Sequence, residues 1–390
     1  MSLHNFTFDT TAGIRFGSGM SKTCAKEISE KLGSKILFIT DKDLMSLKLT
    51  DPILNELRKF SPVVEIFQDV EADPSLKTLL RAIEIGKKIN TTGIIGFGGG
   101  SSMDVAKLTS LILGSNENLD NVWGVSNAKG PRLPLVLVPT TAGTGSEVTP
   151  ISIITVGEEE KKGVSSIIIL PDIAILDPDL TVGLPPLTTA ATGIDAMVHA
   201  IEGYTSLNKN NNPISKMLAI ESLKLLSSSI EKAVFDGFDL EARGNMLIGA
   251  MLAGKAFANS PVAAVHALAY PIGGTFHVSH GLSNSLVLPH VLRFNSANNK
   301  TSKEYAELAP FIFPDIDINR GSQAVCKEFI DKLEILSKKL GLPQKLRELN
   351  IPKNACKKMA SDAMKQTRLL INNPRELSEN DALNIYEAVW

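Results

Sequence analysis

One short apolar stretch, GIDAMVHAIE over residues 193–202, carries an aspartate and a histidine four residues apart. Its apolar residues recur at helical spacing, so Asp195 and His199 are expected on one helix face, where both side chains can reach a common point. A purely structural Asp–His hydrogen bond across one helical turn has the same spacing. The pair alone leaves both interpretations open.

Two further histidines extend this pair into a candidate metal site. His266 and His280 lie in the segment HALAYPIGGTFHVSHG with thirteen residues between them. The Pro-Ile-Gly-Gly sequence at 271–274 is expected to break the helix, so that the two histidines approach from different directions. With Asp195 and His199 they supply one carboxylate and three imidazoles, a donor set typical of divalent transition metals. A divalent ion held by these groups has a formal charge of about +1, which lowers the pKa of an alcohol at the site.

A glycine cluster, GFGGGSSMD over residues 96–104, follows a predicted strand and begins a predicted helix. Glycines at such a turn let backbone N–H groups approach a phosphate closely, and the helix N-terminus favours its negative charge. The serines can cap the helix or bind a phosphate oxygen. A tight strand-to-helix turn without a ligand is the structural alternative. The candidate phosphate-binding residues are Gly98, Gly99, Gly100, Ser101 and Ser102.

An acid and a second loop extend the glycine cluster into a candidate dinucleotide site. Asp41 follows the predicted strand 35–40, where a carboxylate can accept hydrogen bonds from the adenosine ribose. It would repel the 2′-phosphate of NADP, so NAD is the expected cofactor, although an inward-turned Lys42 would offset part of the repulsion. The usual fingerprint places the glycines before the acid, whereas here the acid comes first. The second loop, PTTAGTGS over 139–146, could line the nicotinamide end through Thr140, Thr141 and Thr144.

The two halves of the chain differ in pattern. Short apolar runs alternate with helical patterns up to about residue 180, which predicts a mostly parallel sheet covered by helices. Strands are expected at 35–40, 63–67, 93–97, 134–138 and 173–177, with helices near 21–32, 43–60, 75–89 and 102–113. Beyond the Pro185–Pro186 pair, helical spacing dominates over 188–206, 213–235, 240–258, 322–340 and 354–370. We therefore expect an α/β dinucleotide-binding domain over residues 1–184 and an all-helical metal and substrate domain over residues 185–390.

Composition limits the partners and the compartment. The formal net charge of −2 argues against broad binding to nucleic acid, and no apolar run approaches the length of a membrane span. The three cysteines are far apart in the sequence, which suits a reducing compartment. The start MSLHNFTFDTT has no basic segment followed by an apolar one, so no secretory signal is expected. These features predict a cytoplasmic protein.

Four motifs in order, GGGSSMD, PTTAGTGSE, GIDAMVHAIEGY and VHALAYPIGGTFHVSHG, resemble the iron-containing (group III, metal-dependent) alcohol dehydrogenase family. The resemblance covers nearly the whole chain. It implies an NAD-dependent alcohol dehydrogenase or aldehyde reductase that acts on a small alcohol or aldehyde, with Fe²⁺ or Zn²⁺ as the metal and a homo-oligomeric state, a dimer. It also implies that the metal ligands are Asp195, His199, His266 and His280.

The same resemblance assigns cofactor contacts and exposes two departures. The family's histidine four residues after the third ligand is Tyr270 here, and its asparagine before a proline is Asp73. His277 is then the candidate relay for the alcohol proton, with a surface or packing role as the alternative. The resemblance places dinucleotide contacts at Asp41, Gly98, Gly99, Gly100, Ser101, Thr140, Thr141, Thr144 and Lys161.

Three other functions are compatible with parts of this pattern. One is a reductase of another carbonyl on the same scaffold, such as a polyol, hydroxy-acid or maleylacetate type. Another is a lyase like dehydroquinate synthase, against which the apolar residues around the motifs argue. The third is a nucleotide-sensing protein with a structural metal. Steady NADH formation with simple alcohols would separate a dehydrogenase from the last two.

Overall fold

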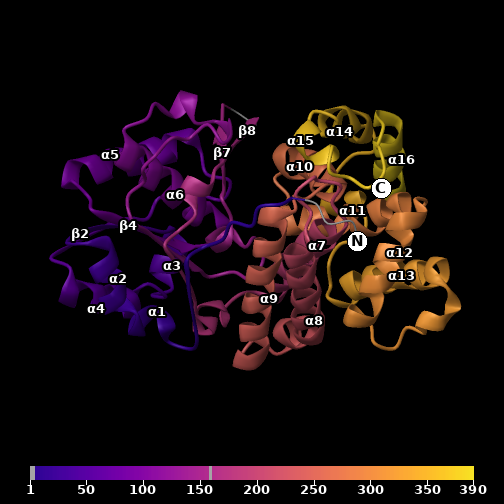
Figure 1. Cartoon of the computed structure of the whole chain (residues 1–390), viewed down its shortest axis with the longest axis horizontal. Helices are drawn as coiled ribbons and strands as arrows, with labels where there is room; N and C mark the ends of the chain where they lie inside the picture. Colours follow the sequence, from indigo (N-terminus) through magenta and orange to yellow (C-terminus); the bar gives the residue numbers. More distant parts are fainter. Residues whose placement is uncertain (1–4, 158–159) are drawn as a thin grey trace. The chain divides into compact units, whose positions relative to one another are not determined.

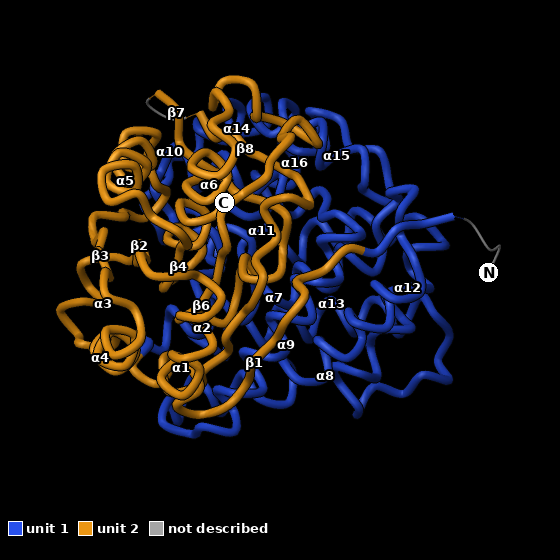
Figure 2. Tube along the Cα trace, turned by 60° about the vertical axis from the view of Figure 1, so that its left-hand side comes forward, with its two compact units in different colours: residues 1–8, 184–390 blue, residues 9–183 orange. Residues whose placement is uncertain are grey.

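The computed structural model describes residues 5–157 and 160–390, which form two compact units (Figures 1 and 2). One unit is Asp9–Gly183. The other is Leu184–Trp390 together with the N-terminal residues up to Phe8. Each unit has its own architecture, and each contains one group of the candidate functional residues.

The Asp9–Gly183 unit is built on a six-stranded parallel sheet with the strand order β1-β9-β6-β4-β2-β3. The mostly parallel sheet predicted from the alternation of strands and helices is confirmed. Five of the strands match the predicted apolar runs, and the added one is the short edge strand β1. The strands are β1 (Gly13–Phe16), β2 (Lys35–Ile39), β3 (Val63–Phe67), β4 (Gly93–Gly98), β6 (Leu135–Pro139) and β9 (Ile173–Leu176).

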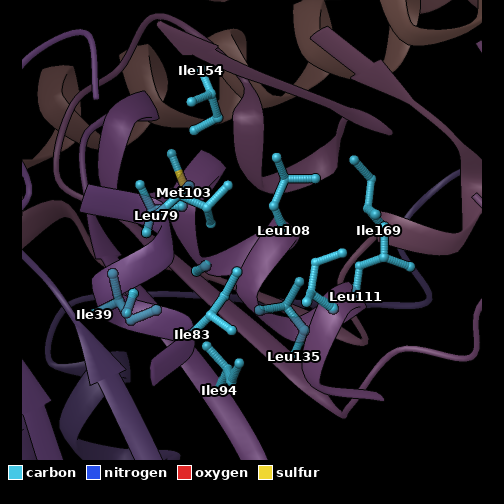
Figure 3. Packing of buried hydrophobic residues seen from close by; sticks show 14 of the residues in the cluster. Ile39, Leu79, Ile83, Ile94, Met103, Leu108, Leu111, Leu135, Ile154 and Ile169 are labelled. Carbon is cyan, nitrogen blue, oxygen red and sulfur yellow. The ribbon is translucent and has the colours of Figure 1, made fainter. Parts of the chain in front are cut away.

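Both faces of this sheet are apolar and covered by helices. In β2, Leu37 and Ile39 belong to one hydrophobic core while Ile36 and Phe38 belong to a second. Side chains of a strand alternate between faces, so continuous apolar runs are what a doubly covered sheet requires. Figure 3 shows the first core, where strand residues meet a central helix. Labelled there are Ile39, Ile94 and Leu135 from the strands and Met103, Leu108 and Leu111 from helix α6.

The helices of this unit alternate with the strands of the sheet (Figure 1). They are α1 (Met20–Thr23), α2 (Ala25–Leu32), α3 (Lys42–Ser46), α4 (Asp51–Phe60), α5 (Leu76–Ile89) and α6 (Gly100–Ser115). A second, three-stranded sheet consists of β5 (Gly124–Val125), β7 (Ile151–Val156) and β8 (Glu160–Ser165). Its strands β7 and β8 are antiparallel and only partly buried. β7 is rich in Ile and Val, whereas β8 begins with charged residues and has no apolar run.

The order of the strands creates one special position. From β2 the chain passes to β3 on one side of the sheet, whereas from β4 it passes to β6 on the other side. The connections therefore diverge between the carboxyl ends of β2 and β4. Open α/β sheets bind ligands at this topological switch point.

The unit that contains Leu184–Trp390 is helical throughout the part that the structure describes, as predicted. Helices α7, α8 and α9 pack on one another, and α11 packs on α7 and α10; α8 and α9 run side by side in Figure 1. The helices are α7 (Pro186–Thr205), α8 (Pro213–Phe235), α9 (Leu240–Asn259), α10 (Ala264–Phe276), α11 (His280–Asn295), α12 (Asn299–Ile312), α13 (Ser322–Lys339), α14 (Ala355–Ala363), α15 (Thr367–Leu370) and α16 (Glu379–Val389).

The predicted helix break at residues 271–274 is wrong. Helix α10 continues through Pro271 and ends at Phe276, and the chain turns instead at His277, which has a φ of 55°. Pro271 and Ile272 are both buried, so tertiary packing outweighs the local preference of proline to end a helix. The turn still allows α10 and α11 to present their histidines from different directions.

Among the residues that the structure describes, no single helix has both the length and the apolar composition to cross a membrane. Only α9 and α10 taken together, which meet at a bend of 108°, pass that test.

Candidate metal centre and dinucleotide loops

Three helices of the helical unit bring the four candidate metal ligands together. Asp195 and His199 lie one turn apart on α7, His266 lies on α10, and His280 begins α11. One donor atom from each lies within 4.8 Å of the donor atoms of the other three. Ligands bound about 2.0–2.2 Å from one ion lie up to about 4.4 Å apart, so a single divalent metal ion fits this group with small adjustments. The His280 side chain is 40 % exposed, which leaves the group reachable from that side.

A glutamate that sequence reasoning missed orients one of these histidines. Glu202 is buried on α7, and its Oε2 lies 2.6 Å from Nδ1 of His266. Its Oε1 accepts a hydrogen bond of 2.7 Å from the N–H of Val265, in the first turn of α10. Because the carboxylate accepts from Nδ1–H, the Nε2 lone pair of His266 is left for a metal ion. The carboxylate therefore sets both the start of α10 and the orientation of the histidine.

An asparagine that was also missed reaches the ligands from α11. Asn284, one turn after His280, is fully buried and donates from Nδ2 to Oδ1 of Asp195 at 2.6 Å. The same Nδ2 lies 3.3 Å from Nε2 of His266 and 3.3 Å from Nε2 of His280. Asn284 thus contacts three of the four ligands and restrains the Asp195 carboxylate.

Close packing holds the helices that carry the ligands. The His199 ring stacks on Phe257 of α9 at 4.3 Å and on His266 at 4.7 Å between ring centroids. At Gly281, a Cβ atom would lie 2.4 Å from the carbonyl oxygen of Ala191. Only glycine at this position allows the first turn of α11 to approach α7, which explains why it follows His280 directly.

The structure places a second carboxylate beside the four candidate ligands. Burial raises the pKa of Asp195, but the three imidazoles and the Asn284 amide outweigh it and hold that pKa below its ordinary value. The expected charge counted Asp195 alone, whereas the Glu202 carboxylate is also buried and bonded to a ligand. Two carboxylates balance a divalent ion, so the centre is formally neutral when Glu202 is included.

The candidate relay residues lie on α10. His277 is exposed and ends the helix in a left-handed conformation. The Tyr270 ring lies 5.9 Å from the His280 ring, and its hydroxyl accepts a hydrogen bond of 3.4 Å from Nη2 of Arg368. Tyr270 therefore lies next to a candidate metal ligand, and the relay role of His277 stays a prediction.

The two candidate cofactor loops lie in the Asp9–Gly183 unit, at the carboxyl ends of neighbouring strands. Gly98 ends β4 with a φ of 146°, a conformation that favours glycine, and Gly99 precedes the first residue of α6. The Thr140 N–H donates to the Gly98 carbonyl at 3.0 Å, which joins the second loop to the first. A Cβ atom at Gly100 would lie 3.1 Å from Cγ2 of Thr144. The structure therefore brings both predicted loops together at one edge of the sheet.

Asp41 follows β2, on the other side of the switch point. It caps α3, and its Oδ1 accepts a hydrogen bond of 2.9 Å from the Leu44 N–H. Burial raises the pKa of its carboxyl above the ordinary value. Lys42, which could have offset its charge, pairs with Asp69 at 3.0 Å.

Lys161 and Asp73, which the resemblance marks as a cofactor contact and a departure from the family, form an ion pair in the structure. Lys161 lies in β8, where its Nζ pairs with Asp73 at 2.8 Å and donates to the Thr155 hydroxyl at 2.9 Å. Asp73 has a φ of 55° and its side chain is exposed. The carboxylate at the family's asparagine position therefore holds the lysine and offsets its charge.

Comparisons with known proteins agree with this arrangement. A model described as "Iron-containing alcohol dehydrogenase" matches residues 11–178, and one described as "Fe-containing alcohol dehydrogenase family, C-terminal" matches residues 189–390. The chain is 40 % identical over 365 residues to long-chain-alcohol dehydrogenase 1 of Geobacillus thermodenitrificans, covering 93 % of this chain and 91 % of the relative.

Solved structures extend the likeness to the whole fold. A crystal structure of a 1,3-propanediol oxidoreductase matches with a TM-score of 0.94 and 32 % identity, over 99 % of this chain and 100 % of the other. Sulfoacetaldehyde reductase from Bifidobacterium kashiwanohense, solved with NAD⁺, matches with a TM-score of 0.85 and 27 % identity, over 99 % of each chain.

An Asp/His₃ donor group, with three members buried, and a paired-loop α/β sheet define a metal-dependent oxidoreductase of the dinucleotide-binding kind. The chain belongs to the iron-containing alcohol dehydrogenase family. It is an oxidoreductase that acts on CH–OH groups, and the predicted alcohol dehydrogenase or aldehyde reductase activity is confirmed.

Proposed function

We propose that this chain transfers hydride between a small alcohol and NAD at one divalent metal ion, in either direction between alcohol and aldehyde. The observation that carries the proposal is the group of Asp195, His199, His266 and His280, whose donor atoms lie within 4.8 Å of one another. Nitrogen and oxygen donors without thiolate suit Fe²⁺, and Zn²⁺ also fits. When bound, the ion supplies Lewis-acid chemistry at the substrate oxygen.

The chain's own residues hold the reacting groups and move the proton. Glu202 orients His266, and Asn284 restrains Asp195, so the donors keep their positions when substrate exchanges. His277 is proposed to pass the alcohol proton to solvent, which suits an exposed imidazole, with Tyr270 as the alternative. The two loops hold the cofactor, whose nicotinamide ring carries the hydride.

The cofactor contacts are proposed from the loops at the switch point. Asp41 accepts hydrogen bonds from the adenosine ribose, while the glycine turn and the N-terminus of α6 hold the pyrophosphate. The second loop lines the nicotinamide end. The residues assigned to NAD are Asp41, Gly98, Gly99, Gly100, Ser101, Ser102, Thr140, Thr141, Thr144 and Lys161.

The two sites assign a separate binding role to each part of the chain. We infer that residues 1–184 bind the dinucleotide and that residues 185–390 bind the metal and the alcohol or aldehyde. The net charge of −2 and the three scattered cysteines support a cytoplasmic enzyme without nucleic acid or membrane partners. Family resemblance supports a homodimer, which light scattering of the purified protein tests directly.

The proposed reaction is tested by measuring NADH formation from a panel of primary alcohols, polyols and hydroxy acids with the metal-loaded protein. We expect steady turnover with small alcohols, oxidation of NADH with the matching aldehydes, and loss of turnover in His280→Ala. His290→Gln changes another histidine of α11 outside the ligand group and serves as the matched control. If the metal-loaded protein turns over no alcohol or aldehyde, the proposal is wrong.

A further inference from the structure

A lysine lies fully buried beneath the candidate cofactor loops. Lys107, on the second turn of α6 after the glycine cluster, has no exposed surface. Its Nζ donates to Oγ of Ser146 at 2.8 Å, to the carbonyl of Ile151 at 2.7 Å and to Oγ1 of Thr149 at 3.3 Å. Lysine is almost never fully buried without such partners, and all three lie in one segment.

An aspartate one turn earlier holds the same segment. Asp104 accepts from the Ser146 hydroxyl through Oδ1 at 2.8 Å and from the Ile153 N–H through Oδ2 at 2.9 Å. The Ser146 hydroxyl thus accepts from Lys107 and donates to Asp104 at the same time. Both ionisable side chains of α6 therefore meet at Ser146.

Ser146 is the residue at which the second cofactor loop ends. Its N–H donates to Oγ1 of Thr144 at 3.2 Å, within that loop. At its start, the loop is joined to the glycine turn by the bond from the Thr140 N–H to the Gly98 carbonyl. The start of the loop is therefore bonded to β4 through the backbone, and its end is bonded to α6 through the buried lysine.

Fold stability alone does not explain a buried ion pair at this place. Lys107 Nζ and Asp104 Oδ1 lie 3.9 Å apart, and Glu147 is buried beside them. Burial lowers the pKa of Lys107 to about 8 and raises that of Glu147 to about 7, so the cluster costs desolvation. Apolar residues of similar volume often replace such clusters without loss of stability. The hydrogen bonds of the cluster give directional control of Ser146, which apolar packing would not give.

We propose that Lys107 is a positioning residue for the dinucleotide, which acts through Ser146 and with Asp104 to hold the loop over residues 139–146 against the glycine turn. The loop is then preformed for the nicotinamide half of NAD. This inference rests on the proposed function, because it assumes that the two loops bind the two halves of one dinucleotide. Asp41 and the glycine turn bind the adenosine half without help from Lys107.

The test compares the binding of NAD with that of AMP, which contains only the adenosine half. Kd values are measured by calorimetry on the full-length, metal-loaded protein and on Lys107→Met, which keeps length but removes the charge. In Lys107→Met the Kd for NAD should rise about tenfold, which corresponds to the loss of one hydrogen bond to a charged group. The Kd for AMP should change less than about twofold. Ser146→Ala should give the same pattern with a smaller change, and it decides the question if Lys107→Met does not fold.

Ser110→Ala is the matched control, because Ser110 lies on the same helix and its hydroxyl donates to the Leu133 carbonyl at 2.6 Å, away from the loop. It should lower the melting temperature without changing the ratio of the two Kd values. Equal losses of NAD and AMP affinity, or unchanged NAD affinity, in the Lys107 and Ser146 variants would overturn the positioning role. A failure of the unsubstituted protein to bind NAD contradicts the proposed function itself, and the inference with it.

Discussion

Nδ1 of His266 and Oε2 of Glu202 lie 2.6 Å apart, and both side chains are buried. The contact joins a proposed ligand on α10 to a carboxylate on α7, the helix that carries two of the other proposed ligands. A histidine whose outward nitrogen bonds to a carboxylate is a stronger and better oriented metal ligand. The proposed metal centre would therefore include Glu202 beside its four candidate donors.

Glu202→Gln tests this relationship. The amide keeps the size of the side chain but removes the charge that faces His266, so the affinity for Fe²⁺ or Zn²⁺ should fall about 10–100-fold. Competition with a chromophoric chelator measures the affinity. Glu304→Gln, which removes a carboxylate paired instead with Lys216, should leave the metal affinity unchanged. Equal affinities in Glu202→Gln and the unsubstituted protein would show that the contact does not tune the ligand.

Asp41 predicts a preference for NAD over NADP. Two like charges about 4 Å apart repel by about 4 kcal/mol at an effective dielectric of about 20, and a third of that is roughly tenfold in affinity. Lys42 is paired with Asp69, so it does not offset the charge. Asp41→Asn removes the charge and keeps an N-cap for α3, so it should narrow the ratio of the kcat/KM values for the two cofactors. Equal or better use of NADP by the unsubstituted enzyme would mean that Asp41 does not hold the ribose.

The proton relay is tested with substitutions that respect the backbone. His277 has a left-handed conformation, which asparagine also tolerates, so His277→Asn removes the imidazole without added strain. If His277 is the relay, the kcat of His277→Asn should be lower than that of the unsubstituted enzyme at about pH 6–8. At higher pH the kcat of the variant should recover, because hydroxide can then take the proton of the alcohol. Tyr270→Phe, which keeps the ring near His280 and removes only the hydroxyl, is the comparison. An unchanged pH profile in His277→Asn with a lowered kcat in Tyr270→Phe would transfer the role to Tyr270.

Glu147 gives a prediction for stability against pH. Burial raises the pKa of its carboxyl from 4.5 to about 7, so the folded protein binds this proton more tightly than the unfolded chain. The resulting stabilisation is complete below about pH 4.5 and is lost as the pH rises through about 7. Glu147→Gln stays neutral, so it should have a higher free energy of unfolding than the unsubstituted protein at about pH 8. Urea denaturation at several pH values measures this, and a difference that does not shrink toward about pH 4.5 would contradict it.

The fold could be predicted where one local pattern decides the structure. β2, β4 and β6 are buried on both faces, and their apolar runs mark them to within about two residues. β1 has four partly or fully exposed residues at the sheet edge, and β8 begins with four charged or glycine residues in succession, so neither resembles a buried strand. α10 was misjudged because Pro271 and two glycines signal a break that packing overrides.

The candidate site likewise contains residues that a local sequence pattern could identify and one that only the packing of distant segments reveals. The i, i+4 spacing that pointed to Asp195 and His199 also relates Asn284 to His280, and Glu202 follows His199 by one turn, so a signal for both missed residues was present. Lys107 is different. Its partners begin 39 residues further along the chain, and only the packing of α6 against β7 and the preceding turn brings them together.

The central claim is that one divalent metal ion, held by Asp195, His199, His266 and His280, is required for hydride transfer. Its most direct test is a titration of chelator-treated protein with Fe²⁺ under anaerobic conditions, following NADH formation from a small primary alcohol. Activity should be absent at the start, rise in proportion to added metal, and level off at one ion per chain, while Asp195→Asn stays inactive throughout. Full activity in the metal-free preparation would contradict the account.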